Sequence, residues 1–180
     1  MFESYLYHPD SGLKTDISVQ DMPEVLKDPR QLLWIDMQDM DDKDIDLLTT
    51  VFNLHPLTVE DLIMPNARPK VENFGEYISL VMFALQSQNN HQKGRVKAIE
   101  LDCCLGRNFL ITFHTDTLTP LALCKERIRK QSPIIMHGAD MLLYSILDSC
   151  VDSYFPVISE FDNLVDEMSD ELFKDPSQDT

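Results

Sequence analysis

The longest regular pattern in the sequence is a helical one near its C-terminus. Between residues 138 and 173, in GADMLLYSILDSCVDSYFPVISEFDNLVDEMSDELF, apolar residues recur every three or four positions. This spacing predicts an amphipathic helix of roughly 35 residues, about 50 Å long at 1.5 Å per residue. A compact domain cannot cover so long a stripe, so another surface is expected to pack on it. Pro156 interrupts the pattern and predicts a kink near Asp152.

Strand-like segments occupy much of the preceding sequence. The segments MFESYLY and LKTDISV flank the turn HPDSG, and LLWIDM is a continuous apolar run, as expected of a strand buried on both faces. PKVENF and EYISLVMFALQ predict a strand pair pivoting on Gly75, and RVKAIELDCCL and NFLITFHT a further hairpin. The sequence therefore predicts about seven strands.

Three shorter helices are expected between these strands. DDKDIDLLTTVFNL starts with Asp41 or Asp42 as its cap, and PLTVEDLI runs from Pro56 until Pro65 closes it. LTPLALCKERIRKQ carries its basic residues near its C-terminal end, where the helix dipole favours them. The fold class is therefore α/β, with a sheet domain at residues 1–137 and a long acidic helix at 138–180.

Charge and composition exclude several classes of protein. The 180 residues carry a net charge of −16, and from Asp140 onward there are eleven acidic residues against one basic residue, Lys174. Such a surface repels nucleic acid and attracts cations. No run of roughly 18 to 20 consecutive apolar residues and no export signal is present. The four cysteines show no CxxC spacing, so reduced thiols in a cytoplasmic protein are expected.

Glu60 and Asp61 stand side by side in HPLTVEDL, just ahead of the basic turn RPK. Such a pair is most often solvated surface, and it is also half of a site for a hard metal ion. Asp148 and Asp152 lie four residues apart on one helix face, which suggests a site without establishing one. His55, before a proline, is expected to be a packing residue at the helix start rather than a ligand.

The segments LLWIDM, FNLHPLTVEDL, RPKVENFGEYISLVMF, KERIRK and DMLLYSILDSCVDSYF together resemble the cytoplasmic N-terminal domain of the CorA family of magnesium and cobalt channels. The resemblance covers residues 32–172, with the segments in the family's order. It implies an αβα sandwich with a mixed sheet and a long C-terminal helix. The family's two transmembrane helices, pore signature and stalk helix have no match in these 180 residues.

The resemblance also implies a function. It implies a soluble regulatory domain that senses divalent cations on the cytoplasmic side of the cell (inner) membrane, in a homopentamer that reaches the membrane only through segments missing here. The regulatory ion is Mg²⁺, or Co²⁺ or another divalent cation, and the ligands that carry over are Glu60, Asp61 and Asp148. A further aspartate, from the family's stalk helix, has no counterpart in this sequence. No catalytic residue and no organic cofactor are implied.

Two other classes of protein remain open from the sequence. One is a magnesium-dependent phosphohydrolase using the same three carboxylates, although no Gly-rich phosphate loop or nucleophile–base pair supports it. The other is a non-catalytic interaction domain whose helix is a docking surface. In dilute solution we expect a monomer or weak dimer, with an apolar stripe at Phe161, Leu164, Met168 and Leu172 available to a partner.

Overall fold

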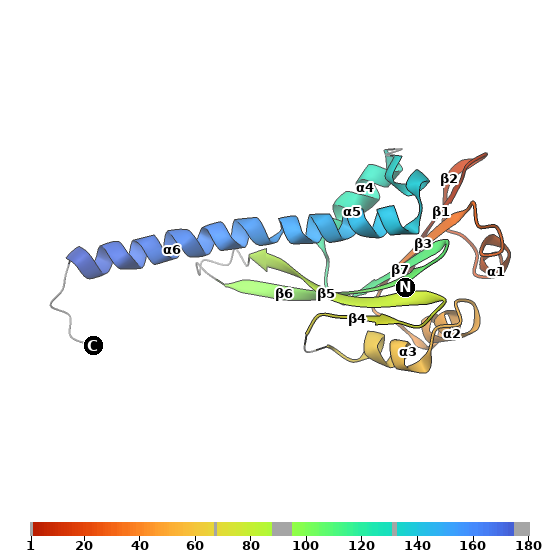
Figure 1. Cartoon of the computed structure of the whole chain (residues 1–180), viewed down its shortest axis with the longest axis horizontal. Coiled ribbons are helices and arrows are strands. Elements are labelled where there is room, and N and C mark those ends of the chain that lie inside the picture. Colours follow the sequence, from red (N-terminus) through yellow and green to blue (C-terminus); the bar gives the residue numbers. More distant parts are fainter. Residues whose placement is uncertain (1, 67, 88–94, 131–132, 175–180) are drawn as a thin grey trace.

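The computed structural model describes residues 2–66, 68–87, 95–130 and 133–174 (Figure 1). The helices and strands follow one another along the chain as β1 (Phe2–His8), β2 (Gly12–Thr15), α1 (Met22–Val25), β3 (Leu32–Gln38), α2 (Asp42–Thr50), α3 (Pro56–Ile63), β4 (Lys70–Asn73), β5 (Tyr77–Ser87), β6 (Val96–Gly106), β7 (Phe109–His114), α4 (Thr119–Arg129), the 3₁₀ helix η1 (Pro133–His137), α5 (Ala139–Asp152) and α6 (Tyr154–Lys174).

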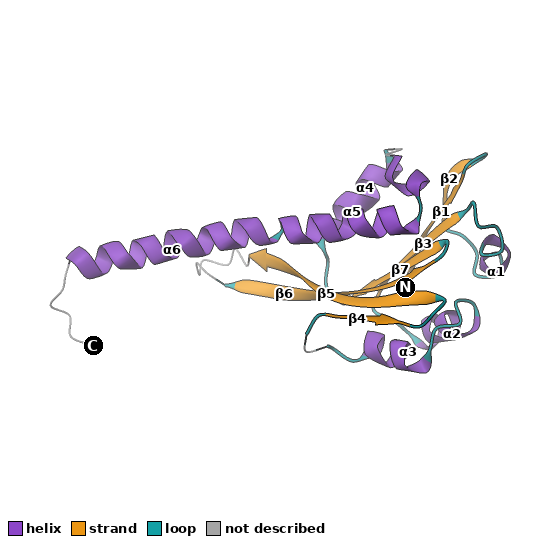
Figure 2. Cartoon of the chain, viewed as in Figure 1, coloured by secondary structure: helices purple, strands orange, loops and turns teal. Residues whose placement is uncertain are grey.

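The strands form one mixed sheet in the order β2-β1-β3-β7-β6-β5-β4 (Figure 2). Only β3 and β7 pair in parallel, with Leu33 opposite Phe109, and the other neighbours are antiparallel. Residues Leu32–Met37 of β3 are buried without interruption, as the apolar run predicted. The prediction of a seven-stranded mixed sheet is therefore confirmed.

Helices cover both faces of the sheet. On one face, α4 and α5 pack on alternate side chains of the central strands, among them Trp34, Leu101 and Leu110. On the other face, α2 and α3 pack on the intervening side chains, among them Ile35 and Ile111. Figure 1 shows these two helical layers on opposite sides of the strands. The predicted αβα sandwich is confirmed.

The first residue of α2 is fixed by a reciprocal cap. The Asp41 carboxylate accepts the backbone N–H groups of Lys43 and Asp44, at 2.9 and 3.0 Å, and Asp44 accepts the N–H of Asp41 at 3.1 Å. All three bonds satisfy backbone donors that have no partner inside the helix. The cap is thus Asp41, one of the two residues that the sequence offered.

The long C-terminal helix is interrupted at Ser153. Pro156 has no N–H for the carbonyl of Asp152, so the regular bonding stops there. The Ser153 hydroxyl donates to the Cys150 carbonyl at 2.5 Å and accepts the N–H of Leu85 at 3.2 Å. The Tyr154 hydroxyl donates to the Phe83 carbonyl at 2.5 Å, so the break is held against the edge of β5. The predicted interruption of the helix is confirmed, but the predicted kink is not, because α6 continues beyond the break in nearly the direction of α5 (Figure 1).

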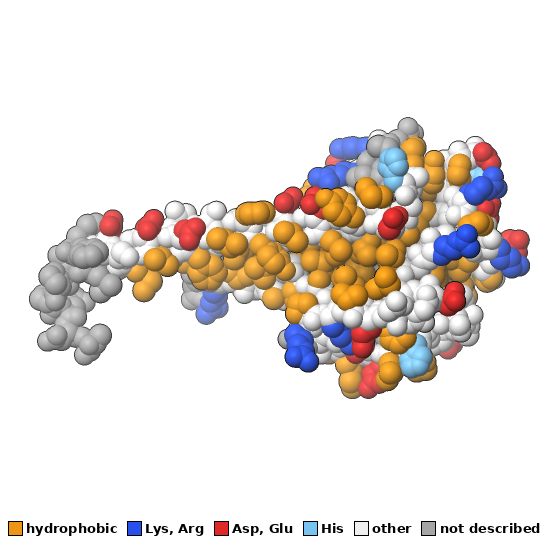
Figure 3. Space-filling model, viewed as in Figure 1, with side chains coloured by type: hydrophobic (Ala, Val, Ile, Leu, Met, Phe, Trp, Pro, Cys, Tyr) orange, Lys and Arg blue, Asp and Glu red, His pale blue; other side chains and the backbone are white. Residues whose placement is uncertain are grey.

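An apolar stripe runs along the outer surface of α5 and α6 (Figure 3). Its exposed members are Met141, Tyr144, Val151, Phe155, Ile158, Phe161, Val165 and Met168. Leu164 of the predicted stripe is half-buried, and the side chain of Leu172 lies outside the described residues. The helical span from Ala139 to Asp170 has the length and composition of a membrane helix, which is weak evidence because a core helix of a soluble protein meets the same test. The stripe therefore lies beside the face of α5 that packs on the sheet, and it continues along α6 (Figure 3).

The four cysteines are free and buried. Cys103 packs on the α4 and α5 face and Cys104 on the α2 and α3 face, as expected for adjacent strand residues. Burial raises the pKa of Cys104 to about 12, so its reactive thiolate is scarce at neutral pH. We expect a thiol reagent at pH 7.5 to leave the folded chain unlabelled and to label all four thiols after unfolding. Mass spectrometry measures this, and rapid labelling of the folded chain would contradict the prediction.

Candidate divalent-cation site

The fold of α3 presents its acidic pair at the surface. The helix starts at His55, whose Nδ1 accepts the N–H of Leu57 at 3.2 Å and whose ring stacks on Phe74 with centroids 5.4 Å apart. Thr58, Val59 and Leu62 form its buried face. Because these residues face the sheet, Glu60 is exposed and Asp61 lies at the edge of the contact. The prediction that His55 packs at the helix start is confirmed.

Asp61 is paired within the chain. Lys70 Nζ lies 2.5 Å from Asp61 Oδ2 and 3.4 Å from Glu72 Oε2, and the hydrogen bond to Asp61 raises the pKa of Lys70. Asn66 donates to the Asp61 carbonyl at 3.1 Å. The basic turn therefore neutralises one member of the acidic pair, while Glu60 faces solvent.

Asp148 lies on the other side of the molecule. It is exposed on α5, whose buried residues Leu142, Ile146 and Cys150 face the sheet. Since α3 and α5 cover opposite faces of the sheet, the structure does not bring Asp148 to Glu60 and Asp61 within one chain. Across the described residues, no group of three or more His, Cys, Asp or Glu side chains is arranged to hold a metal ion. A site with all three predicted ligands needs a second subunit.

A buried charged network was missed by the sequence analysis. The carboxylate of Asp36, on β3, accepts the Thr112 hydroxyl and lies 3.3 Å from His114 Nε2 and 2.5 Å from Lys125 Nζ. Burial alone would raise the pKa of Asp36, but the hydrogen bond and charge of His114, aided by Lys125, hold it below its usual value. Burial likewise opposes the charged form of His114, and the hydrogen bond and charge of Asp36 nevertheless raise its pKa. The network ties β3, β7 and α4 together.

Asp102 is a second acidic residue that sequence reasoning missed. It is 4% exposed on β6, and burial, reinforced by the charges of Glu100 and Asp61, raises its pKa to about 8. The usable signal is one carboxylate inside the apolar run LLWIDM and two, Glu100 and Asp102, among the apolar residues of IELDCCL. A carboxylate so placed must find partners or lose its charge.

Comparison with known proteins identifies the family. The family model described as "CorA-like Mg2+ transporter protein" matches residues 29–180. The chain belongs to the CorA-like Mg²⁺ transporter family. The CorA-like chain is 32% identical over 133 residues to the cobalt/magnesium transport protein CorA of Thermotoga maritima, covering 72% of the chain and 36% of that protein.

Two further similarities extend the comparison. The putative metal ion transporter YfjQ of Bacillus subtilis is 28% identical over 137 residues, covering 76% of this chain and 41% of that protein. The CorA-like chain thus spans about two fifths of the length of these curated relatives. The soluble domain of CorA from Methanocaldococcus jannaschii superposes with a TM-score of 0.69 at 19% identity, covering 97% of this chain and 65% of that one, which shows the shared fold.

Proposed function

We propose that the chain is the cytoplasmic, cation-sensing part of a magnesium or cobalt transporter, with no catalytic role. The relatives named for metal-ion transport support this proposal. The observation that carries it is the placement of exposed Glu60 and Asp148 on opposite sides of the sheet. That arrangement leaves each half-site open to the complementary half of a neighbouring subunit.

The ion would act through electrostatic repulsion between subunits. Two carboxylates 4 Å apart repel by about 1 kcal/mol in water and by more where solvent is excluded. A dication between Glu60 and Asp61 of one subunit and Asp148 of the next converts this repulsion into a net attraction between the subunits. Mg²⁺ suits this arrangement because it is held by one or two carboxylates while keeping several waters. In a homopentamer in the cell membrane, occupied sites hold the pore shut and empty sites let the subunits separate.

Lys70 neutralises Asp61 in each subunit when no metal ion is bound. In the single chain its ammonium group lies on Asp61, at 2.5 Å, with Glu72 already 3.4 Å away. Binding of an ion to Asp61 requires Lys70 to shift towards Glu72. The exchange of one intramolecular cation for a bound dication makes the affinity weak, as a sensor of free cytosolic Mg²⁺ requires.

The proposal predicts a specific pattern of paramagnetic broadening. Mn²⁺, a hard divalent substitute for Mg²⁺, should broaden backbone amide resonances of α3 near Glu60 and of α5 near Asp148, and excess Mg²⁺ should reverse the effect. Asp61→Asn should abolish the α3 broadening. NMR titration of the 180-residue chain measures both sites.

Asp162→Asn is the matched control, because it removes one exposed carboxylate from α6 and leaves α3 and α5 intact. It should preserve both sets of broadened resonances. Uniform broadening along all acidic surfaces, unaffected by Asp61→Asn, would refute the assigned ligands. A magnesium-dependent phosphatase activity lost in Asp61→Asn would favour the hydrolase alternative instead.

A further inference from the structure

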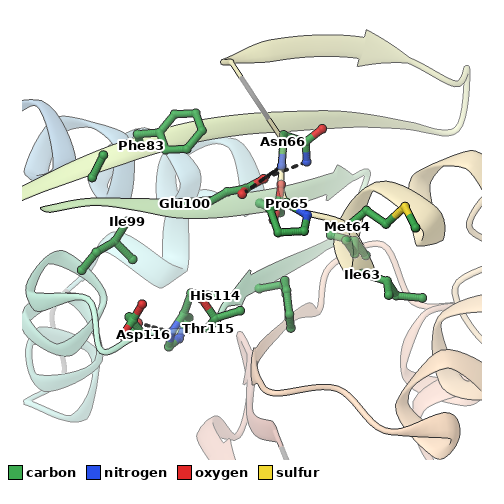
Figure 4. Close-up of a pocket in the computed structure, with 14 residues that line it drawn as sticks. Ile63, Met64, Pro65, Asn66, Phe83, Ile99, Glu100, His114, Thr115 and Asp116 are labelled. Carbon is green, nitrogen blue, oxygen red and sulfur yellow. Dashed lines mark hydrogen bonds between the residues drawn. The ribbon is translucent and has the colours of Figure 1, made fainter.

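A pocket of about 280 Å³ lies where the end of α3 meets β6 and β7 (Figure 4). Its wall is partly apolar, with Met64 and Phe83, and partly acidic, with Glu100 and Asp102. The volume is close to the lower end of the range for small-molecule sites, roughly 300–1,000 Å³. The pocket therefore suits a small ligand with both apolar and polar parts.

Asp102 lacks the partner that a buried carboxyl group needs. The residue is 4% exposed and lines the pocket, and its Oδ1 atom has no hydrogen-bond partner among the described residues. Buried polar atoms in native structures are nearly always hydrogen-bonded, and an unsatisfied one calls for an explanation. A donor supplied by a bound molecule would satisfy this oxygen.

The neighbouring side chains do not supply that donor. Asn66 gives its N–H to Glu100 Oε1 and Oε2 at 3.0 and 3.1 Å, and its side-chain amide to Oε1 at 2.7 Å (Figure 4). Lys70, the cation that acts on Asp102, is engaged by Asp61 and Glu72. These contacts hold Asn66 beside the pocket, and they give the Glu100 carboxylate neutral donors rather than a cation.

The lining distinguishes an organic cation from a metal ion. A metal needs several oxygen or nitrogen ligands around it, and no group of three such side chains occurs in the described part of the chain. A hydrated dication also gains nothing from Phe83 and Met64. An ammonium group on a methylene chain matches both walls, because it donates three N–H bonds and its stem is apolar.

We propose that this pocket binds an aliphatic di- or polyamine, with one ammonium group donating to Asp102 and the methylene chain packed against Phe83 and Met64. The site lies within one subunit, so it does not depend on the ion site proposed above. The chain then has a binding site for organic cations in addition to the proposed site for divalent metal ions. Asp61 is near both, so amine binding and the position of Lys70 are electrostatically linked.

Isothermal titration of the 180-residue chain with 1,5-diaminopentane tests the proposal. At pH 9, above the raised pKa of Asp102 of about 8 and where the diamine is still charged, wild type should bind one equivalent, and Asp102→Asn should weaken binding at least tenfold, because a charge-assisted hydrogen bond is lost. Ala98→Trp, at an exposed position of the wall, should block the pocket without touching a carboxylate. Methylamine should bind more weakly than the diamine, since its stem cannot cover the apolar wall.

Asp162→Asn is again the control, removing the same charge from α6, and it should change the affinity less than twofold. Equal weakening in Asp102→Asn and Asp162→Asn would show diffuse attraction to an acidic protein and overturn the proposal. Unchanged affinity in both Asp102→Asn and Ala98→Trp would overturn it as well. Mg²⁺ binding that requires Asp102, without diamine binding, would make the pocket a metal site and reject the amine.

Discussion

Replacement of Trp34 by alanine is expected to lower the free energy of unfolding by about 3–5 kcal/mol. Trp34 is fully buried in the centre of β3 and stacks on Tyr5, with ring centroids 5.0 Å apart. Its Nε1 donates to the Thr112 hydroxyl at 3.1 Å. The substitution removes the largest side chain of this core and leaves a cavity. Because domains are stable by roughly 5–15 kcal/mol, much of the stability would be lost.

Urea unfolding followed by far-UV circular dichroism measures this effect. Trp34→Phe is the control, because it keeps an aromatic ring beside Tyr5 and loses the indole donor, at an expected cost of about 1–2 kcal/mol. Leu123→Ala, at an exposed position of α4, should cost little. A loss below about 1 kcal/mol in Trp34→Ala would mean that the sheet and α4 close the cavity, contrary to the expected rigidity of the core.

The sequence predicts most of the helices and strands because the residues that each element buries are apolar and recur at regular spacing along the chain. The run LLWIDM specifies a strand buried on both faces. The cap at Asp41 and the proline at position 56, the first residue of α3, specify two helix starts. The strand order is not encoded in this way. The parallel pairing of Leu33 with Phe109 joins residues far apart in the sequence, and periodicity within each strand does not say which strand lies next to it.

The candidate site is predictable in part for the same reason. The apolar pattern of α3 leaves Glu60 exposed, so its availability to an ion follows from the sequence. The partner of Asp61 does not follow from the sequence, because Lys70, on β4, meets Asp61, on α3, only in the folded chain. Likewise, the helical pattern places Asp148 on a surface, but only the sandwich shows that this surface is opposite α3.

Replacement of Lys125 by methionine is expected to destabilise the fold by about 3 kcal/mol at pH 8.5, because it removes the lysine ammonium group that pairs with a buried carboxylate. The Asp36 side chain is 2% exposed, and Lys125 Nζ lies 2.5 Å from it. Methionine keeps the length and packing of the lysine stem, so the loss of stability measures the effect of removing the charge. Lys130→Met, which breaks only the exposed pair with Glu126, is the control and should cost less than about 0.5 kcal/mol.

The loss should be smaller at pH 5.5 because His114 can take over as the cation. The pKa of His114 is raised in the folded state. Its contribution to folding stability is therefore complete below the unfolded-state pKa near 6.5 and is lost as the pH rises through the folded-state pKa. The pKa of Asp36 is lowered in the folded state. Its contribution to folding stability is therefore present above the unfolded-state pKa of 3.8 and is lost only in stronger acid, below the range of pH 5.5 to 8.5. Lys125 opposes protonation of His114, so removing the lysine raises the pKa of His114 further. Denaturant unfolding at both pH values measures the difference, and an equal loss at pH 5.5 and 8.5, or one unaffected by adding His114→Gln, would show that the histidine does not compensate Asp36.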